Sequence, residues 1–352
     1  MAMLTVSNSA IRGIAACVPS TVEKNINLPF YSEEEALSVI KSTGIETRHI
    51  ADDAITATDL CVKAGEVLLD KLRWDKSEVD LVAFVTQMPD FLNQPNSFVC
   101  HEKLGFGPDT MCLDFFQGCP GWVIALSAVS SMIQNGKVKK CLLFAGDTAS
   151  KIQDANDRES RPLFGDAGVA TAIEFDENAA AMFFNIGTDS EGGKAIRQQE
   201  GGARSPYTVA SLKRILDLRT GNTPKHTSEV MDAMDVFGFA ISKVPKSIKK
   251  LCSEYEISLD EINNVYLHQA NKMIIETIAK RLKVSMERVP LGLKYYGNTT
   301  SASIPLTMVS ERKDKLSNDY QKNIACGFGT GLSWASVYFE TSKVVCPEVI
   351  IL

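Results

Sequence analysis

The first half of the chain alternates short apolar runs with segments of helical periodicity. The runs have the length and the continuous apolar character of buried strands. The segment at 58–72 has one apolar face and predicts a helix, and 95–104 is also expected to be helical. Strands alternating with helices predict an α/β fold with parallel strands. We expect these strands at 4–17, 79–86, 111–115, 140–145 and 169–174.

The most apolar helix is predicted at 120–135. Ile124, Ala128 and Met132 recur there at intervals of four, so they share one face. Gly136 follows and is suited to end the helix, because glycine readily adopts the left-handed conformation that helix ends require. The apolar pattern indicates that this helix is buried.

Cys119 directly precedes this helix and lies between Gly118 and Gly121 with Pro120. The helix dipole and the unpaired N–H groups of a first turn stabilise an anion, so we expect a lowered thiol pKa and a thiolate near neutral pH. The two glycines leave room for a substrate. Cys119 is therefore a candidate nucleophile. The alternative is a buried apolar thiol, which most free cysteines are.

The pattern changes at 176–227, where glycine pairs lie among polar residues. We expect loops with short strands there, connecting two halves of the chain at 1–178 and 179–352. The second half again has strands that lead into glycine-rich turns and helices, with a long helix at 230–250 and a final strand at 333–340. A duplicated α/β unit is the predicted organisation.

Three features of the second half are candidates to meet Cys119. His268 follows a predicted strand and precedes a helix, which is where α/β sites form. Asn298 lies on a glycine-flanked loop, and the turn at 327–331 (Gly-Phe-Gly-Thr-Gly) can direct backbone N–H groups at an oxyanion. The alternatives are a core histidine bonded to backbone and a helix-capping asparagine.

Composition excludes several classes of function. The net charge of −6 does not favour a nucleic-acid or anionic-membrane partner, and no apolar run is long enough to cross a bilayer. Nine cysteines without a CxxC pair predict neither a disulfide framework nor a zinc site. No signal peptide is recognisable at the N-terminus and no disulfide framework is predicted, so we expect a cytoplasmic protein. We expect no metal, because the cysteines do not predict a zinc site.

Together these features resemble the Cys-His-Asn condensing enzymes of the thiolase superfamily, and most closely the 3-oxoacyl-[acyl-carrier-protein] synthase III family. The resemblance covers essentially the whole chain. It rests on the order and spacing of the matching motifs, which are Thr43-Gly-Ile-Glu-Thr-Arg-His-Ile-Ala51, Gly118-Cys119, Asp157-Arg158, Phe164-Gly-Asp166, His268-Gln-Ala-Asn271, Gly297-Asn298-Thr299 and the glycine-rich turn before Trp334.

The resemblance implies a five-layer αβαβα fold of two similar halves and a homodimer. It also implies a decarboxylating Claisen condensation in fatty-acid or related biosynthesis. Cys119 would take an acyl group from an acyl thioester, with acyl-CoA as the expected donor, and His268 and Asn298 would donate hydrogen bonds to the enolate formed from malonyl-carrier protein. Coenzyme A and phosphopantetheine thioesters are then substrates, and no cofactor or metal is expected.

The resemblance also assigns binding residues. Phe328, Gly329 and Thr330 would form the oxyanion turn, and Thr43 and Arg158 would contact the substrate. Two other positions depart from the family. Its adenine-clamping Trp and Arg align with Ser38 and Ser42, and its basic carrier-docking positions align with Gly238 and Met273.

These departures leave alternatives open. The turn at 327–331 also resembles that of type III polyketide synthases, so a polyketide or alkylquinolone-type synthase that uses coenzyme A thioesters is one alternative. Cys326-Gly resembles the second cysteine of thiolases, although the Asn298 loop does not fit that group. A non-catalytic partner subunit of a condensing pair is a third alternative, against which the intact triad argues.

Acyl carrier proteins are acidic, so a basic surface is expected to bind them. Lysines recur along one side of the predicted helix at 230–250, and Lys272 lies on the helix after His268. We expect this cluster to replace the missing docking residues; the alternative is an ordinary solvated face. Its members are Lys243, Lys246, Lys250 and Lys272.

Overall fold

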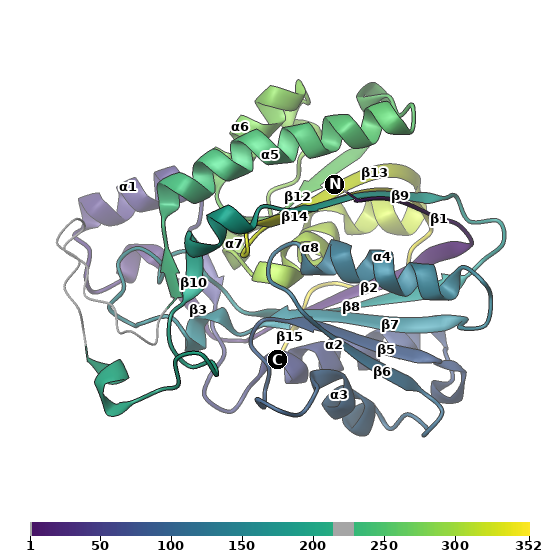
Figure 1. The fold of residues 1–352 in the computed structure, drawn as a ribbon, viewed down its shortest axis with the longest axis horizontal. Coiled ribbons are helices and arrows are strands. Elements are labelled where there is room, and N and C mark those ends of the chain that lie inside the picture. The colour runs from purple at the N-terminus through teal and green to yellow at the C-terminus, as the bar shows by residue number, and fades with distance from the viewer. Residues whose placement is uncertain (1, 214–228) are drawn as a thin grey trace.

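The computed structural model describes residues 2–213 and 229–352. Two β-sheets are stacked in this part of the chain, with helices above, between and below them (Figure 1). The result is a five-layer α/β arrangement, as expected from the resemblance.

The lower sheet has six strands in the described residues, in the order β15-β2-β8-β7-β5-β6. The pairs β5–β6, β5–β7 and β15–β2 are parallel, whereas β2–β8 and β7–β8 are antiparallel. The predicted parallel strands are therefore present in three pairs, and the two antiparallel pairs both involve β8, which lies directly beside β7. The bounds are β2 Ser9–Val18, β5 Leu81–Thr86, β6 Met111–Phe116, β7 Lys140–Asp147, β8 Ala167–Phe175 and β15 Ile350–Ile351.

The upper sheet has five strands within the described ranges, in the order β1-β9-β14-β13-β12. Only β12–β13 is parallel. The single strand predicted at 4–17 is wrong: the chain leaves the upper sheet after Val6 and enters the lower sheet at Ser9. The bounds are β1 Ala2–Val6, β9 Met182–Thr188, β12 Asn264–Leu267, β13 Tyr320–Gly329 and β14 Ser333–Ser342.

Helices α4 (Gly121–Ile133) and α8 (Ser303–Asn318) lie between the two sheets. Trp122 of α4 is fully buried, and its indole N–H donates to the Thr171 hydroxyl at 3.0 Å. Because both sheets cover this layer, α4 is apolar on nearly all sides. The predicted central helix is confirmed, and Gly136 has the expected positive φ of 73°.

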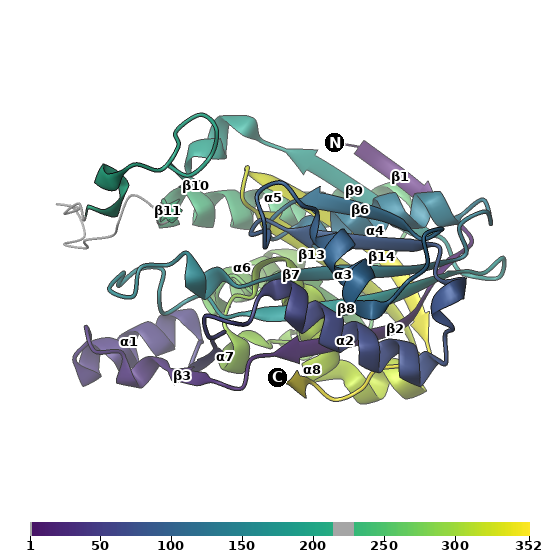
Figure 2. The same ribbon diagram turned by 90° about the horizontal axis from the view of Figure 1, so that it is seen from below.

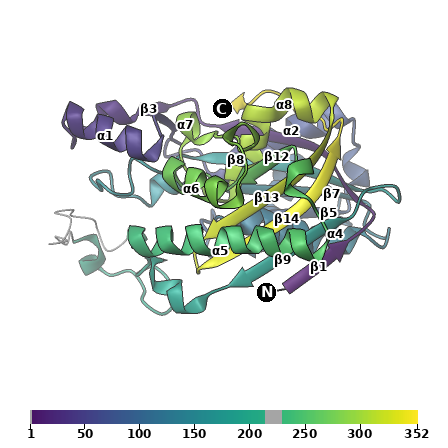
Figure 3. The ribbon, with the colours of Figure 1, turned by 90° about the horizontal axis from the view of Figure 1, so that it is seen from above.

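The outer helices cover the other faces of the sheets. Helices α2 (Ala57–Leu72) and α3 (Asn96–Leu104) pack below the lower sheet (Figure 2), and α5 (Ala233–Glu254) and α6 (Lys272–Leu282) pack above the upper sheet (Figure 3). Helix α5 begins three residues later than predicted, because residues 229–231 form strand β11. The apolar cores above and below are separate from the core between the sheets.

Smaller elements surround one end of the two sheets. They are α1 Glu33–Thr43, α7 Leu293–Tyr296 and the short strands β3 Val22–Lys24, β4 Thr47–His49, β10 Ile196–Gln198 and β11 Glu229–Met231. The short strands β3 and β4 pair with each other, as do β10 and β11. The part of the expected connection at 214–228, which includes His226, lies outside the described residues.

The two terminal strands each lie in the sheet that the other half of the chain builds. Strand β1 pairs with β9 in the upper sheet, and β15 pairs with β2 in the lower sheet. The expected boundary at 178/179 falls between β8 and β9, which belong to different sheets. The division into residues 1–178 and 179–352 stays a prediction.

Candidate active site

A small cavity of about 110 Å³ opens where the ends of both sheets meet. Loops of both halves of the chain line it together with the first turns of α5 and α6. The lining residues that carry chemistry are Gln87, Cys119, His268, Asn271, Asn298, Thr300 and Thr330; Leu163, Phe164, Ile196, Met231, Ala233, Val236, Ala270, Ile274, Phe328 and Gly329 complete it. The three residues expected to act together therefore share one cavity.

Cys119 lies at the start of α4, as its sequence context predicts. The Gly121 N–H donates to the Gly118 carbonyl at 2.8 Å, which turns the chain into the helix directly after Cys119. Strand β13 packs against this turn through two glycines. A Cβ on Gly327 would lie 2.5 Å from Pro120 Cα, and one on Gly329 would lie 2.9 Å from both Cβ and Sγ of Cys119. Only glycine fits at these two positions, which brings the backbone of β13 against the thiol.

His268 follows β12 and is held from two sides. Its backbone N–H donates to the Cys326 carbonyl at 3.0 Å, and its Nδ1 lies 2.7 Å from the hydroxyl of Ser303, the first residue of α8. Burial lowers the pKa of His268 to about 3, so the imidazole is neutral near pH 7. If Ser303 donates to Nδ1, Nε2 carries the proton and is a hydrogen-bond donor toward the cavity.

Asn298 belongs to a loop that is inserted between residues of the first half. Its N–H donates to the Leu163 carbonyl at 2.8 Å, and its own carbonyl accepts from the Gly165 N–H at 3.1 Å. Its side-chain oxygen accepts from the Thr300 N–H at 2.9 Å, which fixes the orientation of the amide. The Nδ2 group has no hydrogen-bond partner among the described residues, so it is available to a ligand.

Asp147 supports this loop from below and was not predicted from the sequence. It ends β7, is fully buried, and accepts from the Thr86 hydroxyl at 2.7 Å, the Gln87 N–H at 3.0 Å and the Ser301 hydroxyl at 2.9 Å. The Thr300 hydroxyl is a further donor. Burial raises the pKa of Asp147, while these donors oppose the shift. The carboxylate thus joins the β5 and β7 ends to the residues that follow Asn298.

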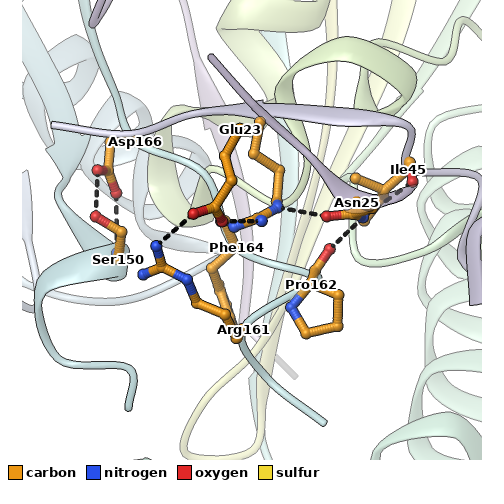
Figure 4. Close-up of polar contacts among 9 residues, drawn as sticks. Glu23, Asn25, Ile45, Ser150, Arg161, Pro162, Phe164 and Asp166 are labelled. Carbon is orange, nitrogen blue, oxygen red and sulfur yellow. Dashed lines mark hydrogen bonds and ion pairs between the residues drawn. The ribbon is translucent and has the colours of Figure 1, made fainter. Parts of the chain in front are cut away.

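Arg48 supports the loop that carries Phe164, through contacts to residues that are labelled in Figure 4. This fully buried side chain donates to Asn25 Oδ1 at 2.9 Å and to the Phe164 carbonyl at 3.2 Å, and it forms an ion pair with Glu23. Asn25 in turn donates to the Pro162 carbonyl at 2.9 Å. The loop that carries Phe164 into the cavity wall is therefore fixed by backbone contacts to a buried cation.

The remaining predicted substrate contacts lie at different places. Phe328, Gly329 and Thr330 line the cavity, whereas Arg158 and Thr43 do not. Arg158 pairs with Glu35 of α1 at 2.7 Å, so it contacts the helix that carries Ser38 and Ser42. Thr43 ends α1, and the next residue, Gly44, lies against Lys272 at the start of α6.

The predicted docking lysines differ in their surroundings. Lys243 pairs with Asp189 at 2.9 Å and lies over the Trp334 ring, and Lys272 lies 3.8 Å from Glu276. Lys246 and Lys250 are exposed on α5 and form no ion pair with a described residue. All three α5 lysines lie beyond the first turns that line the cavity.

Two other expectations can be compared with the structure. Cys326 does not line the cavity; it is fully buried in β13, and burial raises its pKa to about 12. This placement argues against a second catalytic cysteine of the thiolase kind. In the described ranges no cluster of potential metal ligands occurs. No helix there has the length and apolarity needed to cross a membrane.

Comparison with known proteins identifies the same family. Residues 113–192 match the family model of 3-oxoacyl-[acyl-carrier-protein (ACP)] synthase III, and residues 252–341 match the model of its C-terminal part. The beta-ketoacyl-[acyl-carrier-protein] synthase III of Streptococcus mutans serotype c is 30% identical over 322 residues, which are 91% of this chain and 95% of the relative.

Solved structures agree in fold over the whole length. A 3-oxoacyl-(acyl-carrier protein) synthase from Burkholderia xenovorans LB400 is 34% identical and has a TM-score of 0.93, covering 100% of this chain and 99% of that one. A 3-oxoacyl-(acyl carrier protein) synthase III from Pseudomonas aeruginosa PAO1 is 26% identical with a TM-score of 0.82, covering 96% and 99%. The expected thiolase-like α/β fold and the expected acyltransferase class are confirmed. The chain belongs to the 3-oxoacyl-[acyl-carrier-protein] synthase III family, the condensing enzymes of fatty-acid biosynthesis.

Proposed function

We propose that this enzyme transfers an acyl group from an acyl-CoA to Cys119 and condenses it with malonyl-carrier protein. The products are a 3-oxoacyl thioester, carbon dioxide and free coenzyme A. The observation that carries this proposal is the single cavity in which Cys119, His268 and Asn298 meet. Coenzyme A and phosphopantetheine thioesters are substrates in this scheme, and no cofactor or metal takes part.

The first half-reaction uses the start of α4. The thiolate of Cys119 attacks the thioester carbonyl, a new carbon–sulfur bond forms, and the thiol of coenzyme A leaves. The oxyanion of the tetrahedral intermediate is stabilised by backbone N–H groups of Cys119 and of the turn at Phe328, Gly329 and Thr330. The contact between Gly329 and the sulfur supports this assignment.

The second half-reaction uses the two fixed donors. Loss of carbon dioxide from the malonyl group leaves an enolate whose charge lies on the thioester oxygen. Neutral His268 donates from Nε2 and Asn298 from Nδ2, and both are held by bonds at their other polar atom. The enolate carbon then attacks the acyl-Cys119 carbonyl and the thiolate leaves.

This division of labour is tested by His268→Ala and Asn298→Ala. Both variants should still accept an acyl group, because neither donor acts in the first half-reaction. Decarboxylation should fall by roughly 10²–10³ for each, the usual loss for one oxyanion donor. Intact mass follows acylation, and release of labelled carbon dioxide follows decarboxylation. If both variants fail to acylate while remaining folded, the assignment is wrong.

The acyl donor and the carrier use the outer surface of the site in this proposal. Arg158 and Thr43 would contact coenzyme A, since both lie on or against α1 beside the start of α6. Lys243, Lys246, Lys250 and Lys272 would bind the acidic carrier protein. Lys246 lies ten residues beyond Val236 on α5, which is about 15 Å along a helix.

Charge reversal tests the docking surface. Lys246→Glu with Lys250→Glu should raise the KM for malonyl-carrier protein by about tenfold at low salt, and the effect should shrink as salt screens exposed charges. Acylation from a small N-acetylcysteamine thioester should not change. Lys137→Glu with Lys139→Glu makes the same charge change on exposed lysines after α4 and is the matched control. Unchanged carrier kinetics would favour coenzyme A thioesters for both substrates.

A homodimer is part of the same proposal. Strand β6 is the outer strand of the lower sheet, so one of its edges has unpaired backbone groups. Large apolar side chains are exposed on and beside it: Phe116 is 76% exposed, Leu92 is 94% and Phe98 is 51%. An apolar surface next to an open edge is typical of a protein interface. Pairing of β6 with the β6 of a second copy would cover both the apolar surface and the open edge of the sheet.

A further inference from the structure

The inner end of the cavity differs chemically from its outer end. The outer end is formed by the first turns of α5 and α6, where Ala233, Val236 and Ile274 present apolar side chains. This end lies at the surface, because neighbouring Met234 is 76% exposed. A pantetheine arm that enters here and reaches Cys119 fills the outer end. The acyl group attached to Cys119 must then lie at the inner end.

Gln87 lines the cavity beside Gly118, directly before Cys119, so we place it at this inner end. It follows β5, and its backbone is fixed by the bond from its N–H to buried Asp147 at 3.0 Å. Its side-chain oxygen lies 2.3 Å from the position that a Cβ on Gly118 would occupy, and the Thr330 hydroxyl lies 3.3 Å from the same position. The absence of a side chain at Gly118 therefore leaves room for two polar groups directly before Cys119.

These two groups are not used by the protein itself. Among the other polar side chains of the cavity, Asn271 accepts from the Ile274 N–H and caps α6, and Thr300 donates to Asp147. The side-chain amide of Gln87 and the hydroxyl of Thr330 have no hydrogen-bond partner within the described part of the chain. They offer donors and an acceptor to whatever occupies the inner end.

We infer that the acyl group accepted by Cys119 is short and carries an oxygen substituent, a hydroxyl or a carbonyl, that hydrogen-bonds to Gln87. The inference rests on the function proposed above and names its substrate class. An unsubstituted alkyl chain would displace water from the Gln87 amide without replacing its hydrogen bonds, which is unfavourable. Sites built to bond a substrate hydroxyl discriminate strongly against analogues that lack it.

The size of the cavity supports a short chain. Its volume of about 110 Å³ is well below the roughly 300–1,000 Å³ of pockets that hold drug-sized ligands. The substituent takes no part in bond making. Acyl transfer forms the bond from Cys119 Sγ to the carbonyl carbon and breaks the bond to the donor sulfur, which leaves as the thiol with one proton.

The test uses N-acetylcysteamine thioesters of butyrate, 3-hydroxybutyrate and 3-oxobutyrate, which have equal chain length. The rate of Cys119 acylation is measured by intact mass. At least one oxygenated donor should acylate the wild-type enzyme about tenfold faster than the butyryl donor. Gln87→Leu should remove or reverse this preference, and Gln134→Leu, the same change at the far end of α4, should keep it.

The comparison of donors on the wild-type enzyme does not depend on any variant being folded. Equal or faster acylation by the butyryl donor would overturn the inference, as would a preference that survives in folded Gln87→Leu. Failure of all three donors to acylate Cys119 is a distinct result, because it would overturn the proposed function as well.

Discussion

At the scale of single residues, the nine thiols differ in how readily they form a thiolate. Burial raises the pKa of eight of them, so they stay protonated at pH 7 and form thiolate only as the pH rises toward that pKa, which is about 11 for Cys252. Cys119 instead lies at the start of a helix, whose dipole favours the thiolate. The eight are Cys17, Cys61, Cys100, Cys112, Cys141, Cys252, Cys326 and Cys346.

Stoichiometric iodoacetamide at pH 7 should therefore label Cys119 first. Condensation should be lost in proportion to that label, because Cys119 is the one thiol among the described residues that lines the cavity. Peptide mass mapping identifies the labelled residue, and Cys119→Ser should remove the rapid phase. Loss of activity with an earlier label on any other cysteine would contradict the assignment.

The site residues that the sequence predicted lie in local motifs, whereas those that it missed depend on contacts with residues far along the chain. Cys119, His268 and Asn298 lie in local motifs, so neighbouring residues indicated them. Asp147 and Arg48 act through partners far along the chain, such as Ser301 for Asp147 and Phe164 for Arg48. Asp147 and Gln87 do follow predicted strands, and polar residues at strand ends are a signal that could have found them.

At the scale of elements, the site depends on how closely β13 approaches α4. Gly329→Ala should lower the rate of Cys119 acylation by at least about tenfold, because a Cβ there would lie 2.9 Å from the sulfur and must displace it. The rate is measured by quenching the acylation by a small thioester at set times, and circular dichroism checks the fold. Gly238→Ala is the matched control, since nothing lies within 4 Å of its added Cβ. Equal rates for the two variants would refute the role of this contact.

Whether a segment forms a helix or a strand was predicted better than which strands pair with one another. The central helix was predicted from its apolar period and from Gly136, which are local properties. Whether β8 pairs parallel or antiparallel to β7 depends on the path of residues 148–166, and no pattern within either strand records it. The same holds for β1 and β2: only the short polar stretch Ser7-Asn8-Ser9 separates their apolar runs in sequence, although Val6 and Ser9 belong to different sheets.

At the scale of the whole molecule, the proposed dimer can be separated from folding. Phe116→Asp places a charge on the exposed edge strand and should shift the enzyme to monomers at micromolar concentration, because a buried unpaired charge is costly. Light scattering after size exclusion gives the mass. Leu37→Asp introduces the same charge on α1, where Leu37 is 54% exposed, and should leave the mass unchanged. A wild-type enzyme that is monomeric would rule out this interface.

The late position of β14 in the sequence has a consequence for how the chain folds during translation. Every strand of the lower sheet except β15 lies before residue 176, whereas the upper sheet is joined through β14, which pairs with both β9 and β13. A ribosome therefore releases the lower sheet and α4 long before it releases residues 333–342. Until then the side of α4 that faces the upper sheet, where the Trp122 ring lies against Phe339 of β14, has no complete sheet to cover it. The nascent chain should consequently bind chaperones during most of its translation, and ribosome-bound chains that stop before β14 should be cleaved by protease more readily than the finished enzyme.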